Sequence, residues 1–321
     1  MKNNKLLALA PCMAITLFWI LALSGCGGGS STPATVADSQ SLWTQQQSGT
    51  IGTILNAVTK GNGTNLVAVG LSLGNGVIIS SADGITWVSR TSGTSKSLNG
   101  ITWNGNQFVA VGSFGTILTS ADGITWATRV SGTTDTLFGI VWNGTKFVVA
   151  GGSLGSGTTL TSADGAAWAV HASVSAHLLR GIVWNGSKFV AVGDSGAILT
   201  SADGITWAAQ TSGTTNTLTA IAWNGTNKFV AVGIMGTILS SADGMTWATQ
   251  TSPAILSLYG IAWDGTKFVA VGMNDTALVS ADGITWTSQL FVTAGNTLNG
   301  IAWNGSKLVA VGDGGDIRTS P

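Results

Sequence analysis

Seven letters that combine a hydroxyl, a carboxylate and an indole recur along this chain, beginning with SADGITW at residues 81–87. Close copies begin at residues 120, 162, 201, 241 and 280. A serine beside an aspartate offers a nucleophile and an acid or base, so six copies could form a row of reactive sites. The same letters also suit a turn, because a short carboxylate just before a glycine accepts backbone N–H bonds. We call these six segments the Asp-Gly turns.

The repetition itself favours the structural interpretation. Six equivalent turns spread around a repeat protein cannot converge on one substrate. We therefore expect each carboxylate to hold its turn and each tryptophan, four residues later, to pack between repeats. The aspartates are Asp83, Asp122, Asp164, Asp203, Asp243 and Asp282, and the tryptophans are Trp87, Trp126, Trp168, Trp207, Trp247 and Trp286.

Other residues that could carry chemistry are sparse. Two Asp side chains can serve a glycan hydrolase as acid and as base or nucleophile, and the candidates outside the Asp-Gly turns are Asp194, Asp275, Asp313 and Asp316. His171 and His177 fall in one expected loop and could share a metal, but no Cys or Glu lies near them. We predict no catalytic residue, no metal and no cofactor.

The elements that must position these residues form one repeat. GITWNGNQFVAVGSFGTILTSADGITWATR at residues 100–129 recurs as GIVWNGSKFVAVGDSGAILTSADGITWAAQ at residues 181–210. The first-strand tryptophans set a spacing of 39 to 42 residues, at Trp103, Trp142, Trp184, Trp223, Trp263 and Trp303. A period near forty with four short β segments is typical of β-propeller blades.

The turn residues separate four strands in each repeat. Asn104-Gly105 follows the first strand and suits a two-residue type I′ hairpin, which needs positive φ at both positions. The second strand, VAVG or a close variant, occurs seven times, at 66–70, 108–112, 147–151, 189–193, 229–233, 268–272 and 308–312. Its apolar residues occupy both faces, as expected for sheets stacked between other sheets.

We therefore predict an all-β, seven-bladed propeller of four-stranded blades. The last repeat stops at DIRTSP without an outer strand, whereas SLWTQQQSGT, near residue 41, resembles an outer strand with no blade before it. Trp43 and its neighbours should thus complete the C-terminal blade and close the ring. The alternative is an open solenoid, which would need capping repeats.

The Asp-Gly turns resemble the Asp-box, or BNR, repeat of sialidases, sortilin-type receptors and photosystem II assembly-factor-like propellers. The common form has one more residue between Asp and Gly. The resemblance spans almost all of residues 42–321 and implies the propeller fold, but unrelated activities share this architecture. A sialidase also needs an arginine cluster and a tyrosine nucleophile with a glutamate partner. This chain has four arginines, one tyrosine, Tyr259, and no Glu, so the catalytic pattern cannot be carried over.

Comparison of the repeats predicts a uniform face and a varied face. The Asn-Gly hairpins and Asp-Gly turns are nearly identical between repeats, whereas the second hairpins and the inter-blade loops differ, and varied loops are where one asymmetric ligand can be recognised. Apolar residues at the varied tips are Leu73, Phe114, Leu154, Ile234, Met235 and Met273. Polar candidates are Asp194, Asp275, Asp313, Arg180 and Tyr259. These apolar residues either form a binding patch, or pack on neighbouring loops or plug the central channel.

The N-terminus predicts export and lipidation. Residues 1–25 have two lysines, an apolar run and Leu23-Ser24-Gly25 before Cys26, which resembles a bacterial lipoprotein signal cleaved before Cys26. Acyl chains on Cys26 would anchor the protein to a membrane. The Gly, Ser and Thr-rich residues 26–41 predict a flexible linker. We expect an extracytoplasmic protein of the cell envelope, on the outer membrane if the host has one.

The charge balance excludes some partners. Thirteen Lys and Arg residues, two of them Lys2 and Lys5, stand against thirteen Asp residues. Without basic clusters, neither nucleic acid nor an anionic lipid surface is an expected ligand. We predict a monomeric, non-catalytic scaffold that binds a protein or a glycan through its varied face. The alternatives are a divergent glycan hydrolase that uses Asp residues and a structural surface adhesin.

Overall fold

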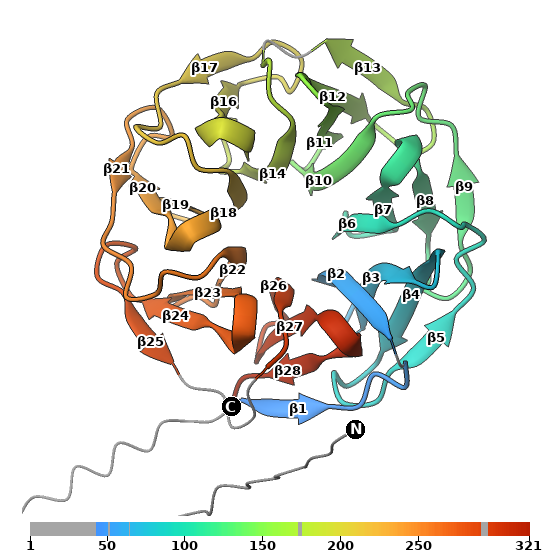
Figure 1. The fold of residues 1–321 in the computed structure, drawn as a ribbon. Helices are drawn as coiled ribbons and strands as arrows, with labels where there is room; N and C mark the ends of the chain where they lie inside the picture. The colour runs from blue at the N-terminus through green and yellow to red at the C-terminus, as the bar shows by residue number, and fades with distance from the viewer. Residues whose placement is uncertain (1–42, 51, 64, 173–174, 290–294) are drawn as a thin grey trace, which may run out of the picture. The chain divides into compact units, whose positions relative to one another are not determined.

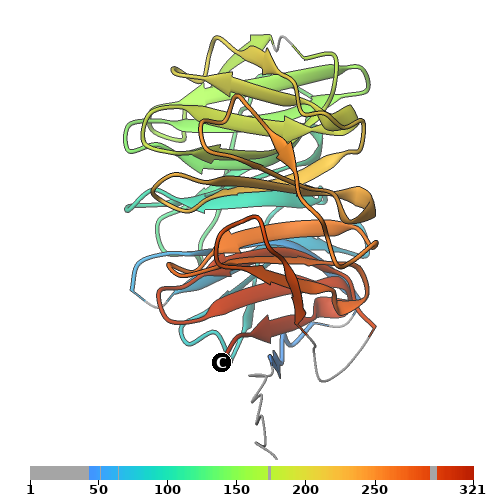
Figure 2. The ribbon, with the colours of Figure 1, turned by 90° about the vertical axis from the view of Figure 1, so that its left-hand side faces the viewer.

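A computed structural model describes residues 43–321 of the 321-residue chain, apart from residues 51, 64, 173–174 and 290–294. These residues form a seven-bladed β-propeller in which each blade is a four-stranded antiparallel sheet (Figure 1). Figure 2 shows the ring from its side. The predicted signal sequence (1–25), Cys26 and the predicted linker (26–41) lie outside the described residues. No described residue belongs to a helix long and apolar enough to cross a membrane.

The strands follow the repeat, from the inner strand of each blade to its outer strand. Blade 1 contains β2 (Thr53–Lys60), β3 (Leu66–Ser72), β4 (Asn75–Ser81) and β5 (Val88–Arg90). Blade 2 contains β6 (Leu98–Trp103), β7 (Phe108–Gly112), β8 (Ile117–Ser120) and β9 (Ala127–Arg129). Blade 3 contains β10 (Thr136–Trp142), β11 (Phe147–Ser153), β12 (Ser156–Ser162) and β13 (Ala169–Ala172). Blade 4 contains β14 (Leu179–Trp184), β15 (Phe189–Gly193), β16 (Ile198–Ser201) and β17 (Ala208–Gln210).

The remaining blades repeat this order. Blade 5 contains β18 (Leu218–Trp223), β19 (Phe229–Gly233), β20 (Ile238–Ser241) and β21 (Ala248–Thr249). Blade 6 contains β22 (Leu258–Trp263), β23 (Phe268–Gly272), β24 (Ala277–Ser280) and β25 (Thr287–Gln289). Blade 7 contains β26 (Leu298–Trp303), β27 (Leu308–Gly312), β28 (Ile317–Thr319) and, as its outer strand, β1 (Thr44–Gln46).

Blade 7 closes the ring with strands from both ends of the described chain. Strand β1 pairs antiparallel with β28, so that Thr44 lies opposite Thr319. Trp43 is 2% exposed, and its indole N–H donates to Oε1 of Gln289 in blade 6 at 3.1 Å. The predicted closure of the ring is confirmed. Figure 1 shows β1 beside β28 at the seam.

The hydrophobic core is divided among the contacts between neighbouring blades. Each of seven buried clusters combines side chains from two adjacent blades. In one of them, Trp87 of blade 1 packs with Val309 and Val311 of blade 7. The tryptophans of the Asp-Gly turns thus pack between blades, as predicted. In blade 2, Phe108 lies between two indoles, 4.4 Å from the Trp103 ring and 6.3 Å from the Trp126 ring.

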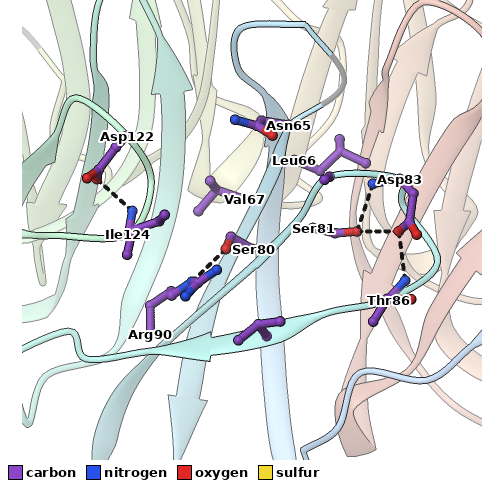
Figure 3. A pocket seen from close by; sticks show the side chains of 12 residues that line it. Asn65, Leu66, Val67, Ser80, Ser81, Asp83, Thr86, Arg90, Asp122 and Ile124 are labelled. Carbon is purple, nitrogen blue, oxygen red and sulfur yellow. Dashed lines mark hydrogen bonds between the residues drawn. The ribbon is translucent and has the colours of Figure 1, made fainter.

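The Asp-Gly turns have the predicted structural role (Figure 3). Oδ1 of Asp83 accepts the backbone N–H groups of Ile85 and Thr86, both at 2.8 Å. The Ser81 hydroxyl donates to the same carboxylate at 2.9 Å and accepts the Gly84 N–H at 2.8 Å. The carboxylates of the other five turns accept the same pair of N–H groups. In every turn, Oδ1 of the aspartate and the serine hydroxyl are therefore engaged in holding the turn.

The prediction of type I′ turns at the Asn-Gly dipeptides is wrong. Trp103 pairs with Phe108, so the loop between them has four residues rather than two. Gly105 has φ +102, but Asn104 does not have positive φ. Oδ1 of Asn104 instead accepts the N–H groups of Asn106 and Gln107, at 2.9 and 2.8 Å. The asparagine side chain closes the loop, and this removes the need for a left-handed backbone at that residue.

Candidate binding face

The turns of each blade fall on two opposite faces of the ring. The Asn-Gly loops and Asp-Gly turns share one face, where Nζ of Lys146 donates to the Asp203 carbonyl of the next blade at 3.1 Å. The second hairpins and the inter-blade loops share the other, where the Gly115 N–H donates to the Asp135 carbonyl at 2.7 Å. We call this second side the loop face. It carries the varied residues that the repeats predict as a binding surface.

The second hairpins of the loop face have two forms. In blades 1 and 3 the strands extend further and end in two-residue tips, Leu73-Gly74 and Leu154-Gly155. The other five blades have a single turn of 3-10 helix whose second residue has left-handed φ. These second residues are Phe114, Ser195, Met235, Asn274 and Gly314.

Apolar side chains stand out from this face. Leu73 is 94% exposed, Phe114 67%, Leu154 103% and Met235 71%. Ile234 and Met273, also predicted as part of the patch, are partly buried at the first position of their turns. Two exposed residues of the inter-blade loops were missed by the sequence argument: Val130 and Ile255, at 85% and 87%. Among the described residues, every large apolar side chain exposed by 67% or more lies on the loop face.

Two of these residues have a left-handed backbone conformation, which is unfavourable for residues with a side chain. Phe114 has φ +56 and Met235 has φ +55, where a side chain with a Cβ costs about 1–2 kcal/mol relative to right-handed backbone. Blade 7 has Gly314 at the same position, so the fold itself does not require a bulky residue there. The Lys96 ammonium lies 4.4 Å from the centre of the Phe114 ring and gives that side chain one contact within the propeller. Neither the backbone nor the hydrophobic effect explains the exposed Met235. Observed strain of this kind points to a functional role.

The polar candidates are placed differently from one another. Arg180 and Asp194 form an ion pair, with Nε to Oδ1 at 2.5 Å and Nη2 to Oδ2 at 3.3 Å, and both side chains are about one third exposed. Oδ1 of Asp313 accepts the side-chain amide of Asn299 at 2.9 Å. Tyr259 is partly buried on strand β22. These residues remain candidates for a binding surface.

Asp275 does not belong to that surface, contrary to the prediction. Its side chain is 4% exposed, and Oδ2 lies 3.4 Å from Nη2 of Arg318. Arg318 also bonds Asp316 at 2.9 Å, and both of these side chains are nearly fully buried. Burial raises the pKa of Asp275, and the Arg318 guanidinium acts against that rise. We call these three residues the buried ion cluster.

A hollow of about 430 Å³ lies where the inner strands meet, and we call it the axial pocket. It is lined by Asn56, Asn99, Phe138, Arg180, Thr217, Thr219, Ile234, Tyr259 and Asn299. Seven of these residues, one from each blade, occupy one position of the repeat. Each follows a buried leucine of the inner strand and sits at a β-bulge. Bulges commonly re-aim a side chain, and here they place all seven around one pocket.

Four of the seven bulge residues bond adjacent blades together. The side-chain amide of Asn56 donates to the Leu98 carbonyl at 2.8 Å, and that of Asn99 donates to the Leu137 carbonyl at 2.9 Å. Asn299 donates to the Leu55 carbonyl at 3.1 Å, and the Thr219 hydroxyl donates to the Leu258 carbonyl at 2.7 Å. We call these bonds the inter-blade clamps.

The other three bulge residues, Phe138, Arg180 and Tyr259, do not follow this pattern. Phe138 has no donor. The Arg180 guanidinium lies 5.3 Å from the Phe138 ring centre and bonds Asp194 instead. The Tyr259 hydroxyl has no hydrogen-bond partner among the described residues. The sequence argument listed Arg180 and Tyr259 only as polar candidates of the varied face and missed Phe138 and the four clamp residues.

The two histidines are not neighbours in a loop. His171 belongs to strand β13, where its Nε2 lies 2.8 Å from the Thr161 hydroxyl, whereas His177 is exposed beyond the strand. No three His, Cys, Asp or Glu side chains of the described residues are grouped as a metal site would need. The hollow of about 330 Å³ in Figure 3, between blades 1 and 2, is lined by residues of two Asp-Gly turns and adjoining strands. Ser81, Asp83 and Asp122 hold the turns, and Nε of Arg90 donates to the Ser80 hydroxyl at 2.8 Å.

Comparisons with known proteins give structural neighbours only. No family model matches this chain, and no curated protein matches it. A structure of YCF48 bound to D1 peptide superposes with a TM-score of 0.70 at 19% identity, over 91% of this chain and 99% of that one. YCF48 from Cyanidioschyzon merolae has a TM-score of 0.69 at 15% identity, over 87% and 98%. The Cps50 (Swd1) β-propeller domain of Myceliophteria thermophila has a TM-score of 0.65 at 13% identity, over 86% and 97%. At these identities the likeness shows that the chain shares the propeller fold.

Proposed function

We propose that this protein is a non-catalytic scaffold that binds a partner protein through its loop face. The observation that carries the proposal is the exposure of Phe114 and Met235 on left-handed backbone, at a position where blade 7 has glycine. The Lys96 ammonium lies 4.4 Å from the Phe114 ring centre, but the Phe114 and Met235 side chains both remain 67% or more exposed. Because left-handed backbone at such residues costs stability, their remaining apolar surface is best explained by a contact with a partner. Leu73 and Leu154 extend the same face with further exposed apolar surface.

The structural neighbour YCF48 bound to D1 peptide supports a protein partner, because it is a propeller of similar size that holds a peptide. The hydrolase alternative gains no support from the candidate acids. Asp194 bonds Arg180, Asp313 bonds Asn299, and Asp275 and Asp316 are buried around Arg318. In each case the carboxylate already serves a contact within the propeller.

We further propose that Cys26 carries the lipid that holds the protein on the extracytoplasmic side of a membrane. The chain enters the propeller at Trp43, ahead of β1, the outer strand of blade 7. Trp43 occupies the position that the tryptophans of the Asp-Gly turns have in the other blades, at the start of an outer strand. Metabolic labelling with a radioactive fatty acid tests the anchor, and failure of Cys26→Ala to abolish labelling would refute it.

The test of the scaffold compares two double variants. Phe114→Gly/Met235→Gly removes apolar surface from the loop face, whereas Ile124→Gly/Met245→Gly removes matched surface, about half exposed, from the opposite face. Glycine relieves the left-handed backbone only in the first pair, so we expect that variant to be at least as stable as the wild type. The measurement is capture of proteins from detergent-solubilised host membranes, followed by titration of the purified partner.

We expect the loop-face variant to lose its partner and the opposite-face variant to keep it. Loss of the partner from both variants, or from neither, would contradict the assignment of the loop face. The thermal stability of each variant, measured in parallel, separates loss of the contact surface from loss of the fold.

A further inference from the structure

The axial pocket differs from the rest of the ring in a way that the fold does not require. At the bulge position, Asn or Thr lets one blade bond the Leu carbonyl of the next, and four blades use this clamp. Blades 3, 4 and 6 give up the clamp and place Phe138, Arg180 and Tyr259 there. The buried leucine before the bulge residue is the same in all seven blades. The three exceptional blades therefore differ from the others in the bulge side chain and not in the buried leucine before it.

The three exceptions form one sector of the pocket wall. Blades 3 to 6 contribute Phe138, Arg180, Thr219 and Tyr259, while blades 7, 1 and 2 contribute the three clamp asparagines. The guanidinium of Arg180 lies over Phe138, and Ile234 from the blade 5 tip adds an aliphatic wall. One side of the pocket is therefore aromatic and aliphatic, and the other side is lined by carboxamides.

The charges of the pocket limit its ligand. Among the described residues, Arg180 is the only charged one that lines it, and both Nε and Nη2 of Arg180 are bonded to Asp194. The pair is neutral as a unit, so an anionic ligand would have to compete with an existing carboxylate for the guanidinium. The remaining polar groups are carboxamides and hydroxyls, among them the Tyr259 hydroxyl, which has no partner among the described residues. This chemistry suits an uncharged ligand that has both apolar surface and amide groups.

We propose that the axial pocket binds an extended segment of the partner protein and takes up one of its uncharged apolar or aromatic side chains. A volume of about 430 Å³ is in the range of small-ligand pockets, and it holds one large side chain with its flanking peptide groups. The side chain packs on Phe138, Ile234 and Tyr259. A flanking backbone N–H donates to the side-chain oxygen of Asn56 or Asn299, because the side-chain nitrogens of both residues are engaged in the inter-blade clamps. This inference rests on the proposed function and names the chemistry of the contact.

The experiment uses the full chain, immobilised in detergent, to select short random peptides from a phage library. The comparison variant is Phe138→Asn/Tyr259→Asn, which gives blades 3 and 6 the side chain that blades 1, 2 and 7 use for their clamps. Enriched peptides are synthesised, and their affinities are measured by fluorescence anisotropy for wild type, this pocket variant and the tip variant Phe114→Gly/Met235→Gly. Near-ultraviolet circular dichroism and thermal unfolding establish that the pocket variant is folded.

We expect the wild type to enrich peptides in which a large apolar or aromatic residue is flanked by uncharged residues. Their affinity should fall by about tenfold or more in the pocket variant and change little in the tip variant. No enrichment by the wild type, an acidic consensus, or equal affinity for the pocket variant would overturn the proposal. Displacement of the peptides by simple methyl glycosides would assign the pocket to sugars and overturn it equally.

The two tests fail separately. A partner that is lost from the tip variant but binds wild type and pocket variant equally would leave the scaffold proposal intact and reject the pocket as its contact. A partner that is unaffected by the tip variant, together with peptides that need the pocket, would reject the exposed tips and retain the pocket.

Discussion

Arg318 stands in β28 where the other six blades have a buried leucine or isoleucine, and its neighbours have changed to accommodate it. Asp275 replaces the glycine found at the end of the other 3-10 tips and has φ +54. Asp316 replaces a threonine or alanine, and Ala277 replaces the isoleucine that blades 2, 4 and 5 have at the start of the third strand. The four substitutions bring a buried ion cluster to the contact between blades 6 and 7.

Removal of the cation alone should destabilise the protein strongly. Arg318→Leu leaves Asp275 and Asp316 buried without their counterion, and breaking such a group typically costs about 3–5 kcal/mol. In domains slightly smaller than this one, the unfolding temperature shifts by about 2–4 °C for each kcal/mol. The unfolding temperature of Arg318→Leu should therefore fall by roughly 10 °C. Since unpaired buried carboxyl groups take up protons, the deficit should shrink as the pH is lowered.

Replacement of the whole cluster by the residues of the other blades should not have this cost. Asp275→Gly/Ala277→Ile/Asp316→Thr/Arg318→Leu restores an apolar contact and relieves the left-handed backbone at residue 275. A threonine at 316 can accept the Asn296 amide, as Thr237 accepts that of Asn216 at 2.9 Å in blade 5. Apolar replacements of buried ion groups range from neutral to about 4 kcal/mol more stable.

Urea unfolding followed by tryptophan fluorescence measures both variants, and calorimetry gives their unfolding temperatures. The ordering is the decisive result: the single variant should be the least stable, and the fourfold variant should equal or exceed the wild type. If Arg318→Leu is as stable as the wild type, the cluster does not act as a unit. If the fourfold variant is less stable than Arg318→Leu, the equivalence of the blades is the wrong basis for the prediction.

Two further predictions concern the turns and the clamps. The N–H groups bonded to Asp122 lower the pKa of its carboxyl from 3.8 to about 2. Because the unfolded chain therefore binds the proton more tightly, the stability that this carboxylate contributes is present above pH 4 and is lost as the pH falls towards 2. On acid titration, the unfolding temperature of Asp122→Asn should thus fall less than that of the wild type. Asn99→Ala removes the bond to the Leu137 carbonyl and should lower the free energy of unfolding, measured in urea, by about 1 kcal/mol. An equal decrease in a control variant with a Leu-to-Met substitution elsewhere in blade 2 would argue against a specific clamp.

Local and periodic signals predicted the fold because a propeller repeats one unit of four strands that are neighbours in the sequence. The spacing of the tryptophans gave the blade length, and the unmatched strand around Trp43 gave the closure. The Asn-Gly prediction was wrong because a side-chain bond from Asn104 competes with the backbone preference of the dipeptide. A prediction of turn type from φ preferences alone fails where a side chain of the turn bonds the backbone of the same turn.

The candidate binding face was predicted in part. Exposed tips such as Phe114 and Met235 were found because an apolar residue in a turn is unusual. Phe138 was missed because it sits in a strand, where an apolar residue is expected, and only the bulge turns it towards the axis. Asp275 was placed on the surface because its partner, Arg318, is 43 residues away and no spacing rule links them. Aligning the residue after each inner-strand leucine across the seven repeats would have revealed the axial position.

The pairing of β1 with β28 also imposes an order on folding. Residues of these strands in contact, such as Gln46 and Thr319, are 273 apart in the chain, and closing a loop of that length costs about 5 kcal/mol in chain entropy. Each of the first six blades forms from neighbouring segments, so closing its loops costs less chain entropy. The ring must therefore close last, as a slow step that waits for the final strands, and the same strands should be the first to exchange their amide protons when the native ring opens.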